Sequence, residues 1–226
     1  MKKLFAAELK TFPDPETSLE GVVDLSDDLR VERLLEAYSF GIFPWPHDDL
    51  PTLWYSPEER GVLDFADFHV PKSLNKFLRQ QCWTYTFNQA FDEVIESCAG
   101  LKRPGQMGTW INKKIVRAYR EFHAAGYAHS LEVWDGDCLI GGLYGVYVGG
   151  LFCGESMFYR ETNASKAALV KLVEFLKSQG LTWMDIQMVT PVLEGFGGKY
   201  MKRKKFLAKL EQAKHSALPV KFEIKT

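Results

Sequence analysis

The sequence has few of the features that mark whole classes of protein. Its four cysteines are Cys82, Cys98, Cys138 and Cys153, and they form no CxxC pair. This argues against a zinc site and favours free thiols in a reducing compartment. The five histidines show no metal-ligand spacing, so we expect no bound metal. The formal net charge is −1, so any contact with RNA would depend on a local basic patch.

Long apolar runs are also absent. Residues 138–154 are mainly apolar, but they include several glycines and are shorter than the ~20 residues that a membrane span needs. The N-terminal stretch MKKLFAAELK begins like a signal peptide, but Glu8 interrupts its apolar run. We therefore expect a cytoplasmic protein that does not bind membranes.

What the chain does contain is enough material for a sizeable core. It has 226 residues, of which 46% are hydrophobic and 25% charged, a composition typical of soluble globular proteins. Residues 41–60 hold four prolines and two tryptophans, which favours an ordered aromatic loop. We place a domain boundary near residue 60, with a small N-terminal domain over 1–60 and a larger domain over 61–226.

Hydrophobic spacing predicts helices over 29–39, 70–80, 87–100, 112–125, 165–178 and 203–214. It predicts strands over 128–134, 138–148, 151–158 and 181–189, with hairpin turns at Asp135-Gly136 and Gly149-Gly150. Three antiparallel strands, a helix and a further strand indicate an α+β fold with a mostly antiparallel sheet. The same order occurs in the core of the GNAT acyltransferase fold, an analogy that does not establish chemistry.

Two acids stand in apolar strands. If side chains alternate, Glu155 shares a face with Leu151, Cys153 and Met157, and Asp185 shares one with Gln187 at a Cα separation of about 6.6 Å. A buried carboxylate needs a partner. Either Glu155 pairs with a Lys or Arg while Asp185 caps a loop, or both acids face a pocket and handle an amine. Spacing alone leaves both interpretations open.

Seven segments in register resemble one family. They are AYSFGIFPW, GTWI, AHSLEVW, GGLYG, LFCGESMF, NASKAAL and MDIQ, and they fit in order from about Ser26 to Leu210. Together they resemble leucyl/phenylalanyl-tRNA–protein transferases. The resemblance implies a small N-terminal domain packed on a GNAT-like acyltransferase domain.

The resemblance also implies an activity. Members of the family move Leu or Phe, and sometimes Met, from aminoacyl-tRNA to the N-terminal amine of acceptor proteins that usually begin with Lys or Arg. The product enters N-degron proteolysis. Because an aminoacyl ester is already activated, no ATP, metal or other cofactor is expected.

Site residues follow from the matched motifs. Asp185 would polarise Gln187, whose carbonyl oxygen would take the proton from the attacking amine. Glu155 would hold the α-amino group of the donor. The aminoacyl pocket and the contacts to the tRNA end would involve Tyr38, Trp45, Trp110, Tyr119, Leu143, Phe152, Met157, Leu169 and Leu172. A basic helix over 72–79, with Lys72, Lys76 and Arg79, would bind the acceptor stem.

Two other functions compete with this hypothesis. An acyl-CoA-dependent N-acyltransferase would need a glycine-rich pyrophosphate loop before the helix at 165–178, and RETNASKAAL has no glycine there. A non-catalytic tRNA-binding module would not need Asp185 and Gln187 together. The chain departs from many relatives at 192–203, where Val192 stands in place of a histidine and Lys202-Arg203 in place of Pro-Arg.

Overall fold

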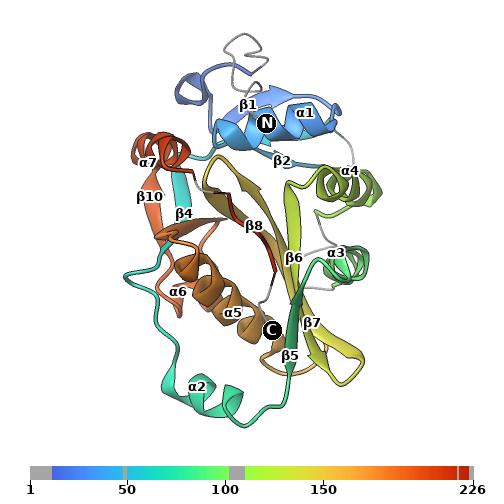
Figure 1. Ribbon diagram of the computed structural model, residues 1–226. Helices are drawn as coiled ribbons and strands as arrows, with labels where there is room; N and C mark the ends of the chain where they lie inside the picture. Colours follow the sequence, from blue (N-terminus) through green and yellow to red (C-terminus); the bar gives the residue numbers. More distant parts are fainter. Residues whose placement is uncertain (1–11, 48–49, 102–109, 218, 224–226) are drawn as a thin grey trace.

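A computed structural model describes residues 12–47, 50–101, 110–217 and 219–223 (Figure 1). Its first sheet has the order β1-β3-β2 and is antiparallel, with β1 at Val22–Leu25, β2 at Phe43–Trp45 and β3 at Leu53–Tyr55. The 3-10 turn η1 (Pro15–Thr17) precedes this sheet, and helix α1 (Val31–Ser39) connects β1 to β2. The expected loop over 41–60 was thus partly wrong, because it contains two short strands. Pro44 is tolerated since β2 lies at an edge of the sheet.

The second sheet has seven strands in the order β10-β4-β9-β8-β7-β6-β5. They are β4 (Glu59–Asp64), β5 (Thr84–Phe87), β6 (Ala128–Asp135), β7 (Cys138–Val148), β8 (Leu151–Tyr159), β9 (Trp183–Gln187) and β10 (Lys199–Lys202). Only the β8–β9 pairing is parallel. The mixed architecture, its largely antiparallel sheet and the β6-β7-β8 meander are confirmed. Strands β4, β5 and β10 were not expected, and the proposed division at residue 60 stays a prediction.

Helices cover both faces of this sheet. They are α2 (Lys72–Leu78), α3 (Phe91–Ala99), α4 (Lys113–Ala124), α5 (Ala164–Ser178), α6 (Pro191–Glu194) and α7 (Arg203–His215). Helices α1, α3, α4 and α7 bury their apolar sides in one cluster, here the α4-side core, which includes Tyr119 and Phe158. Helix α5 packs into a second cluster, the α5-side core, which includes Leu143 and Leu169. Figure 1 shows α4 and α5 on different sides of β7 and β8.

A bulge in β8 falls at Glu155. Tyr144 of β7 pairs with Ser156 and the next residue, Gly145, pairs with Gly154, so Glu155 has no opposite number. An extra residue reverses the alternation of side chains beyond it. Cys153 therefore packs in the α4-side core, whereas Met157 packs against the α5-side core. The expectation that Met157 shares a face with Glu155 was wrong for this reason.

Strands β8 and β9 are paired only just before Glu155 and Gln187. Their parallel register is defined by the single pair Cys153–Asp185. Two residues further along each strand stand Glu155 and Gln187, and a side-chain hydrogen bond joins them in place of backbone pairing. Backbone pairing between β8 and β9 is thus replaced, at Glu155 and Gln187, by a side-chain contact.

None of the described helices is both long and apolar enough to cross a membrane. Within the described ranges, no cluster of three or more His, Cys, Asp or Glu side chains has metal-binding geometry.

Candidate functional site

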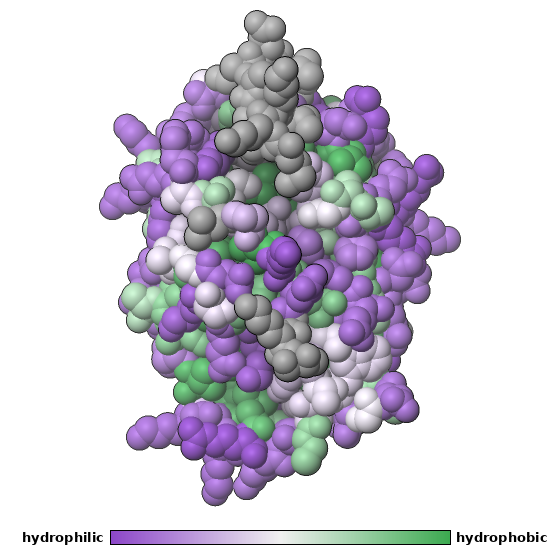
Figure 2. All heavy atoms as spheres, in the orientation of Figure 1, coloured by the Kyte–Doolittle hydropathy of each residue, from purple (hydrophilic) through white to green (hydrophobic). Residues whose placement is uncertain are grey.

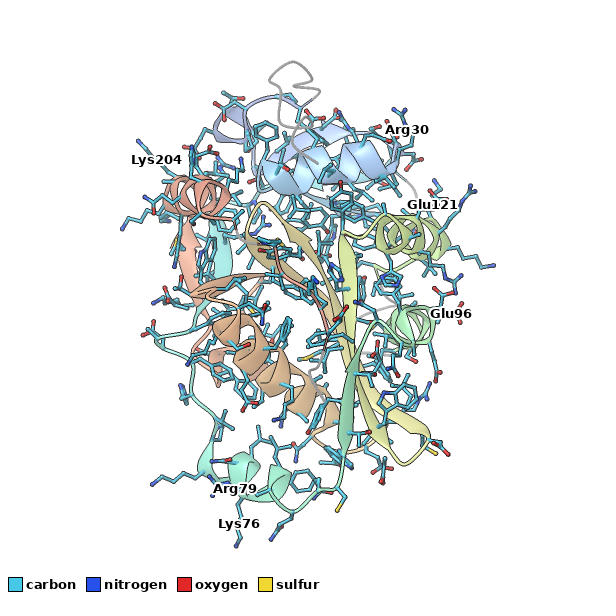
Figure 3. The ribbon with its side chains drawn as sticks, viewed as in Figure 1. Arg30, Lys76, Arg79, Glu96, Glu121 and Lys204 are labelled. Carbon is cyan, nitrogen blue, oxygen red and sulfur yellow. The ribbon has the colours of Figure 1, made fainter. Side chains whose placement is uncertain are left out.

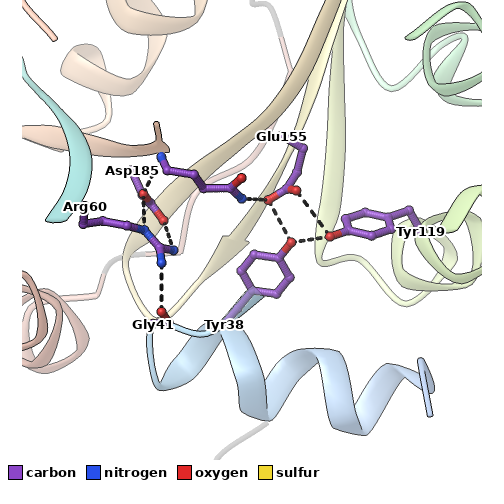
Figure 4. A network of polar contacts seen from close by, with 7 residues as sticks. Tyr38, Gly41, Arg60, Tyr119, Glu155 and Asp185 are labelled. Carbon is purple, nitrogen blue, oxygen red and sulfur yellow. Dashed lines mark hydrogen bonds and ion pairs between the residues drawn. The ribbon is translucent and has the colours of Figure 1, made fainter. Parts of the chain in front are cut away.

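Glu155 lies at the meeting point of three elements (Figure 4). Tyr38 of α1 donates a hydrogen bond to its Oε1 at 2.8 Å, and Tyr119 of α4 donates to its Oε2 at 3.3 Å. The two tyrosine hydroxyls also lie within hydrogen-bonding distance of each other. Each hydroxyl has one proton, so with an ionised Glu155 the tyrosines can donate in only two of these three oxygen–oxygen contacts at a time. Nε2 of Gln187 donates to Oε1 of Glu155 at 2.7 Å, and the carboxylate keeps acceptor capacity for an incoming donor.

The electrostatics of this cluster are unusual. Among the described residues no Lys or Arg forms an ion pair with Glu155, so its partners are two hydroxyls and one amide. Burial raises the pKa of Glu155 to about 7, and hydrogen bonds from Tyr38 and Gln187 offset part of that effect. Burial and the nearby Glu155 charge raise the pKa of both tyrosines well above the usual range. Glu155 therefore titrates near neutral pH while the tyrosines stay protonated.

Asp185 is held by an arginine that the sequence did not single out. Nε of Arg60 donates to Oδ1 at 2.9 Å and Nη2 donates to Oδ2 at 2.6 Å. Both side chains are almost fully buried, Arg60 at 1% exposure and Asp185 at 0%. Of the two interpretations of the acids, pairing with a cation thus applies to Asp185, not to Glu155. Arg60 ends the 41–60 segment that was predicted to be an aromatic loop; as part of a strand, it would share a face with Val62.

Gln187 adopts a backbone conformation that strand alternation does not predict. Its φ is 58°, in the left-handed region, and its backbone N–H donates to Oδ1 of Asp185 at 2.9 Å. Gly61 lies opposite it on β4, where an added Cβ would meet the Met188 backbone at 2.9 Å. Left-handed geometry at a residue other than glycine stores strain of about 1–3 kcal/mol, which surrounding structure must support.

The contact between Asp185 and Gln187 differs from the one expected. Asp185 binds the backbone N–H of Gln187 and has no hydrogen bond to its side-chain amide. Nε2 of Gln187 donates to Glu155, and its amide oxygen Oε1 accepts no hydrogen bond from the described residues. That oxygen is a vacant acceptor beside a carboxylate whose pKa is near 7. The arrangement can bind an amine and receive its proton.

The residues expected to line the aminoacyl pocket fall into two groups. Tyr38, Trp45, Trp110 and Tyr119 belong to or pack on the α4-side core, where the two indoles stack at 5.7 Å between ring centroids. Leu143, Phe152, Met157, Leu169 and Leu172 belong to or pack on the α5-side core. Of the first group, Tyr38 and Tyr119 hydrogen-bond to Glu155. Of the second group, Leu169 and Leu172 belong to α5, and the other three residues lie on β7 and β8.

The expected single cavity joining both acids is not among the two cavities that stand out in the described residues. One of about 600 Å³ is lined by Pro71, Ser73, Leu74, Phe77, Asn163, Lys166, Pro191, Val192, Gly195 and Phe196. The other, of about 210 Å³, lies between α7 and the start of β9. Figure 2 shows hydrophobic surface beside α2, where the larger cavity opens, with polar side chains around it. This larger cavity includes Val192, at the start of the 192–203 segment.

Of the three basic residues expected to contact tRNA, Lys72 and Lys76 lie on α2 and Arg79 follows its last residue. Lys72, Lys76 and Arg79 are all exposed, and Figure 3 shows Lys76 and Arg79 directed away from the molecule. Leu74 and Phe77 of the same helix line the larger cavity, so α2 has one basic side and one side that faces the cavity.

Comparison with known proteins places this site in context. Residues 62–211 match the model of the leucyl/phenylalanyl-tRNA protein transferase family, and residues 27–58 match the model of that family's N-terminal domain. A leucyl/phenylalanyl-tRNA–protein transferase of Shewanella baltica (strain OS195) is 47% identical over 214 residues, which cover 93% of this chain and 90% of the relative. One from Shewanella sp. (strain W3-18-1) is 49% identical over 208 residues, covering 91% and 88%.

Similarity to solved structures is more distant. L-PGS from Bacillus licheniformis aligns with a TM-score of 0.42 and 14% sequence identity, covering 80% of this chain and 69% of that one. A likeness of this size does not define the fold class. The family models cover residues 27–58 and 62–211, which include Tyr38, Tyr119, Glu155, Asp185 and Gln187 but not Arg60. With the curated relatives they show that the chain belongs to the leucyl/phenylalanyl-tRNA–protein transferase family.

Proposed function

We propose that the protein transfers Leu or Phe, and possibly Met, from aminoacyl-tRNA to the N-terminal α-amine of acceptor proteins. The amine nitrogen forms a bond to the ester carbonyl carbon, the bond from that carbon to the ribose oxygen breaks, and the amine proton ends on the released ribose hydroxyl. The observation that carries this proposal is the orientation of the Gln187 amide. Its Nε2 donates to Oε1 of Glu155 at 2.7 Å, so its own Oε1 is left to accept a hydrogen bond from an amine. Glu155, beside it, has a pKa of about 7.

Gln187 and Glu155 have different roles in this proposal. Oε1 of Gln187 accepts a hydrogen bond from the attacking amine and so fixes its direction. A neutral amide is a very weak base, so the proton cannot rest there. Glu155 has a pKa of about 7, close to the working pH, which suits a group that holds a donor α-ammonium or takes up a proton. Most of the rate gain comes from holding ester and amine together.

The apolar residues supply donor selectivity. Tyr38 and Tyr119 contact Glu155 directly, and the second group of expected pocket residues packs in the α5-side core. A pocket that buries a Leu or Phe side chain gains about 1.5–3 kcal/mol over leaving it exposed. We assign Tyr38, Trp45, Trp110, Tyr119, Leu143, Phe152, Met157, Leu169 and Leu172 to donor and tRNA-end contacts.

Further parts of the proposal concern partners and context. The basic side of α2, with Lys72, Lys76 and Arg79, is proposed to contact the phosphates of the acceptor stem. Preference for acceptors that begin with Lys or Arg, entry of the product into N-degron proteolysis and a cytoplasmic location are carried by the family resemblance. The GNAT-like assignment is supported by parallel strands β8 and β9, which pair only at Cys153–Asp185 and then separate.

Transfer of labelled amino acids tests the function directly. Purified protein is mixed with tRNA charged with labelled Leu, Phe, Met or Val, and with peptides that differ only at residue one: Lys, Arg, Asp or Met. We expect label on the Lys and Arg peptides from Leu and Phe, less from Met and little from β-branched Val, which shape excludes only modestly.

Two outcomes would contradict this. Transfer to no peptide from any charged tRNA would overturn the enzyme assignment. A rise in melting temperature with acetyl-CoA but not with aminoacyl-tRNA would favour a CoA-dependent acyltransferase, since a ligand stabilises the state that binds it. Deacylated tRNA serves as the control, because binding alone predicts the same shift with and without the amino acid.

A further inference from the structure

Among the described residues, Arg60 is the most completely buried lysine or arginine. It lies on β4 at 1% exposure, and every edge of its guanidinium has a defined contact. Two nitrogens donate to the two carboxylate oxygens of Asp185, and Nη1 donates to the carbonyl oxygen of Gly41 at 3.0 Å. A paired, planar guanidinium in this geometry cannot rotate without losing several charge-assisted hydrogen bonds at once.

Aromatic rings fix its two faces as well. The guanidinium carbon lies 4.5 Å from the ring centroid of Phe43 and 4.7 Å from that of Phe206. Gly41 and Phe43 belong to the segment that leads into β2 of the first sheet, and Phe206 belongs to α7. Arg60 therefore contacts three parts of the chain: the N-terminal sheet, helix α7 and strand β9.

The consequence for the site passes through Asp185. Its Oδ1 accepts from Nε of Arg60 and from the backbone N–H of Gln187, both at 2.9 Å. That second bond holds the left-handed turn at Gln187, and the turn aims Nε2 at Glu155 and leaves Oε1 vacant. If the Asp185 carboxylate tilts, the backbone of Gln187 loses its anchor and the amide loses its direction (Figure 4).

We propose that Arg60 is a positioning residue for the transfer reaction, which acts through Asp185 on the backbone of Gln187 and so sets where the amide oxygen stands. This inference rests on the function proposed above and gives Asp185 a different task from the one expected. Asp185 anchors the main chain of Gln187, and Arg60 orients the Asp185 carboxylate through two parallel hydrogen bonds. Arg60 itself touches neither donor nor acceptor.

The test is a double-mutant cycle on the full chain. Arg60→Lys keeps the charge but cannot form both parallel bonds to the carboxylate. We measure the single-turnover rate of Leu transfer from charged tRNA to a Lys-initiated peptide, and the dissociation constant for charged tRNA, in wild type, Arg60→Lys, Gln187→Ala and the double variant. Displacing a catalytic group by about 1 Å can cost ~100-fold, so we expect Arg60→Lys to slow transfer about 10- to 100-fold.

The cycle separates positioning from mere support of the fold. In the Gln187→Ala background Arg60→Lys should slow transfer less than about 3-fold, because the group that it positions is gone. Binding of charged tRNA should change less than about 3-fold. An equal rate loss in both backgrounds, or no rate loss in either, would overturn the proposal. Arg60→Gln, which keeps one side-chain donor, replaces Arg60→Lys in the same cycle if the lysine variant does not fold.

Arg33→Lys is the matched control. Arg33 is also a shielded arginine, 11% exposed at its side chain, which pairs with Asp24 and lies 3.5 Å over the ring of Phe12, but it is outside the site. It should lower the melting temperature and leave the rate per folded molecule unchanged. If wild type transfers neither Leu nor Phe, both the proposed function and the role of Arg60 are wrong. If wild type transfers and the cycle is additive, only the role of Arg60 fails.

Discussion

At the residue scale, Glu155 has neighbours that donate hydrogen bonds but carry no positive charge. Tyr38, Tyr119 and Gln187 satisfy its oxygens, while burial works against its ionised form. A carboxylate in such a place binds a passing cation more readily than one already neutralised by Lys or Arg. In the proposed function that cation is the donor α-ammonium group. The two tyrosines serve this role because they donate hydrogen bonds to Glu155 without neutralising its charge.

This environment predicts a pH-dependent stability difference between wild type and Glu155→Gln. The folded pKa of Glu155 is about 7 and its ordinary value is 4.5, so between these pH values the folded state binds more protons than the unfolded state. Stability contributed by the neutral acid is therefore present below pH 4.5 and lost as pH rises to 7. At about 1.4 kcal/mol per pKa unit, the loss is at most roughly 3 kcal/mol.

Urea unfolding at pH 5 and pH 8 measures this difference. The glutamine variant has nothing to titrate, so wild type should lose stability relative to it between the two pH values. Other acids contribute equally to both proteins and cancel. A stability difference that is the same at both pH values would show that Glu155 is not held in the environment described.

The sequence predicted the polar residues of the site but not the residues that position them. Glu155, Asp185 and Gln187 could be predicted because a carboxylate in an apolar strand is chemically conspicuous, and because their motifs match a family. Arg60 could not, because β4 has only six residues and the face that Arg60 shares with Val62 becomes evident only once the strand is known. The left-handed turn at Gln187 depends on Gly61, which is distant in sequence and adjacent only in the sheet.

At the element scale, the β4–β9 pairing determines the geometry of the site. Gly61 of β4 faces Gln187 of β9, and the register shifts there between Gly61 and Val62. Helices and the β6-β7-β8 meander were predictable because their periods extend over many residues. Strands β2, β3, β4, β5 and β10 are three to six residues long, too short for a period to emerge, and the bulge at Glu155 leaves no trace in the alternation.

Gly61→Ala should disturb both stability and rate. A Cβ there would lie 2.9 Å from backbone atoms of Met188, which cannot yield as a flexible side chain can. We expect a loss of about 1–3 kcal/mol in the free energy of unfolding, together with slower transfer, because the turn at Gln187 must shift. Denaturant unfolding and single-turnover transfer check the two effects.

Gly100→Ala is the control for this substitution. Gly100 follows α3, its backbone is right-handed, and an added Cβ would lie 3.5 Å from its nearest neighbour, an ordinary contact. It should leave transfer unchanged. If Gly61→Ala transfers as fast as wild type, Gln187 does not need the conformation seen here.

At the scale of the whole molecule, the site is where separate parts of the chain meet. Tyr38 comes from α1, Tyr119 from α4, Glu155 and Gln187 from the two strands that separate, and Arg60 connects these to Gly41 and α7. No one segment holds a functional unit by itself. The N-terminal part of the chain therefore contributes to the candidate site, since α1 supplies Tyr38 and both Gly41 and Phe43 contact Arg60.

The single-turnover rate of Gln187→Ala tests the central claim most directly. With Leu-tRNA in excess of its dissociation constant and a Lys-initiated peptide, the variant should bind charged tRNA within about 3-fold of wild type. It should transfer Leu about 10- to 100-fold more slowly, since it lacks the amide oxygen that directs the amine. Transfer at the wild-type rate would contradict the claim that this oxygen, held between Asp185 and Glu155, is where the reaction is organised.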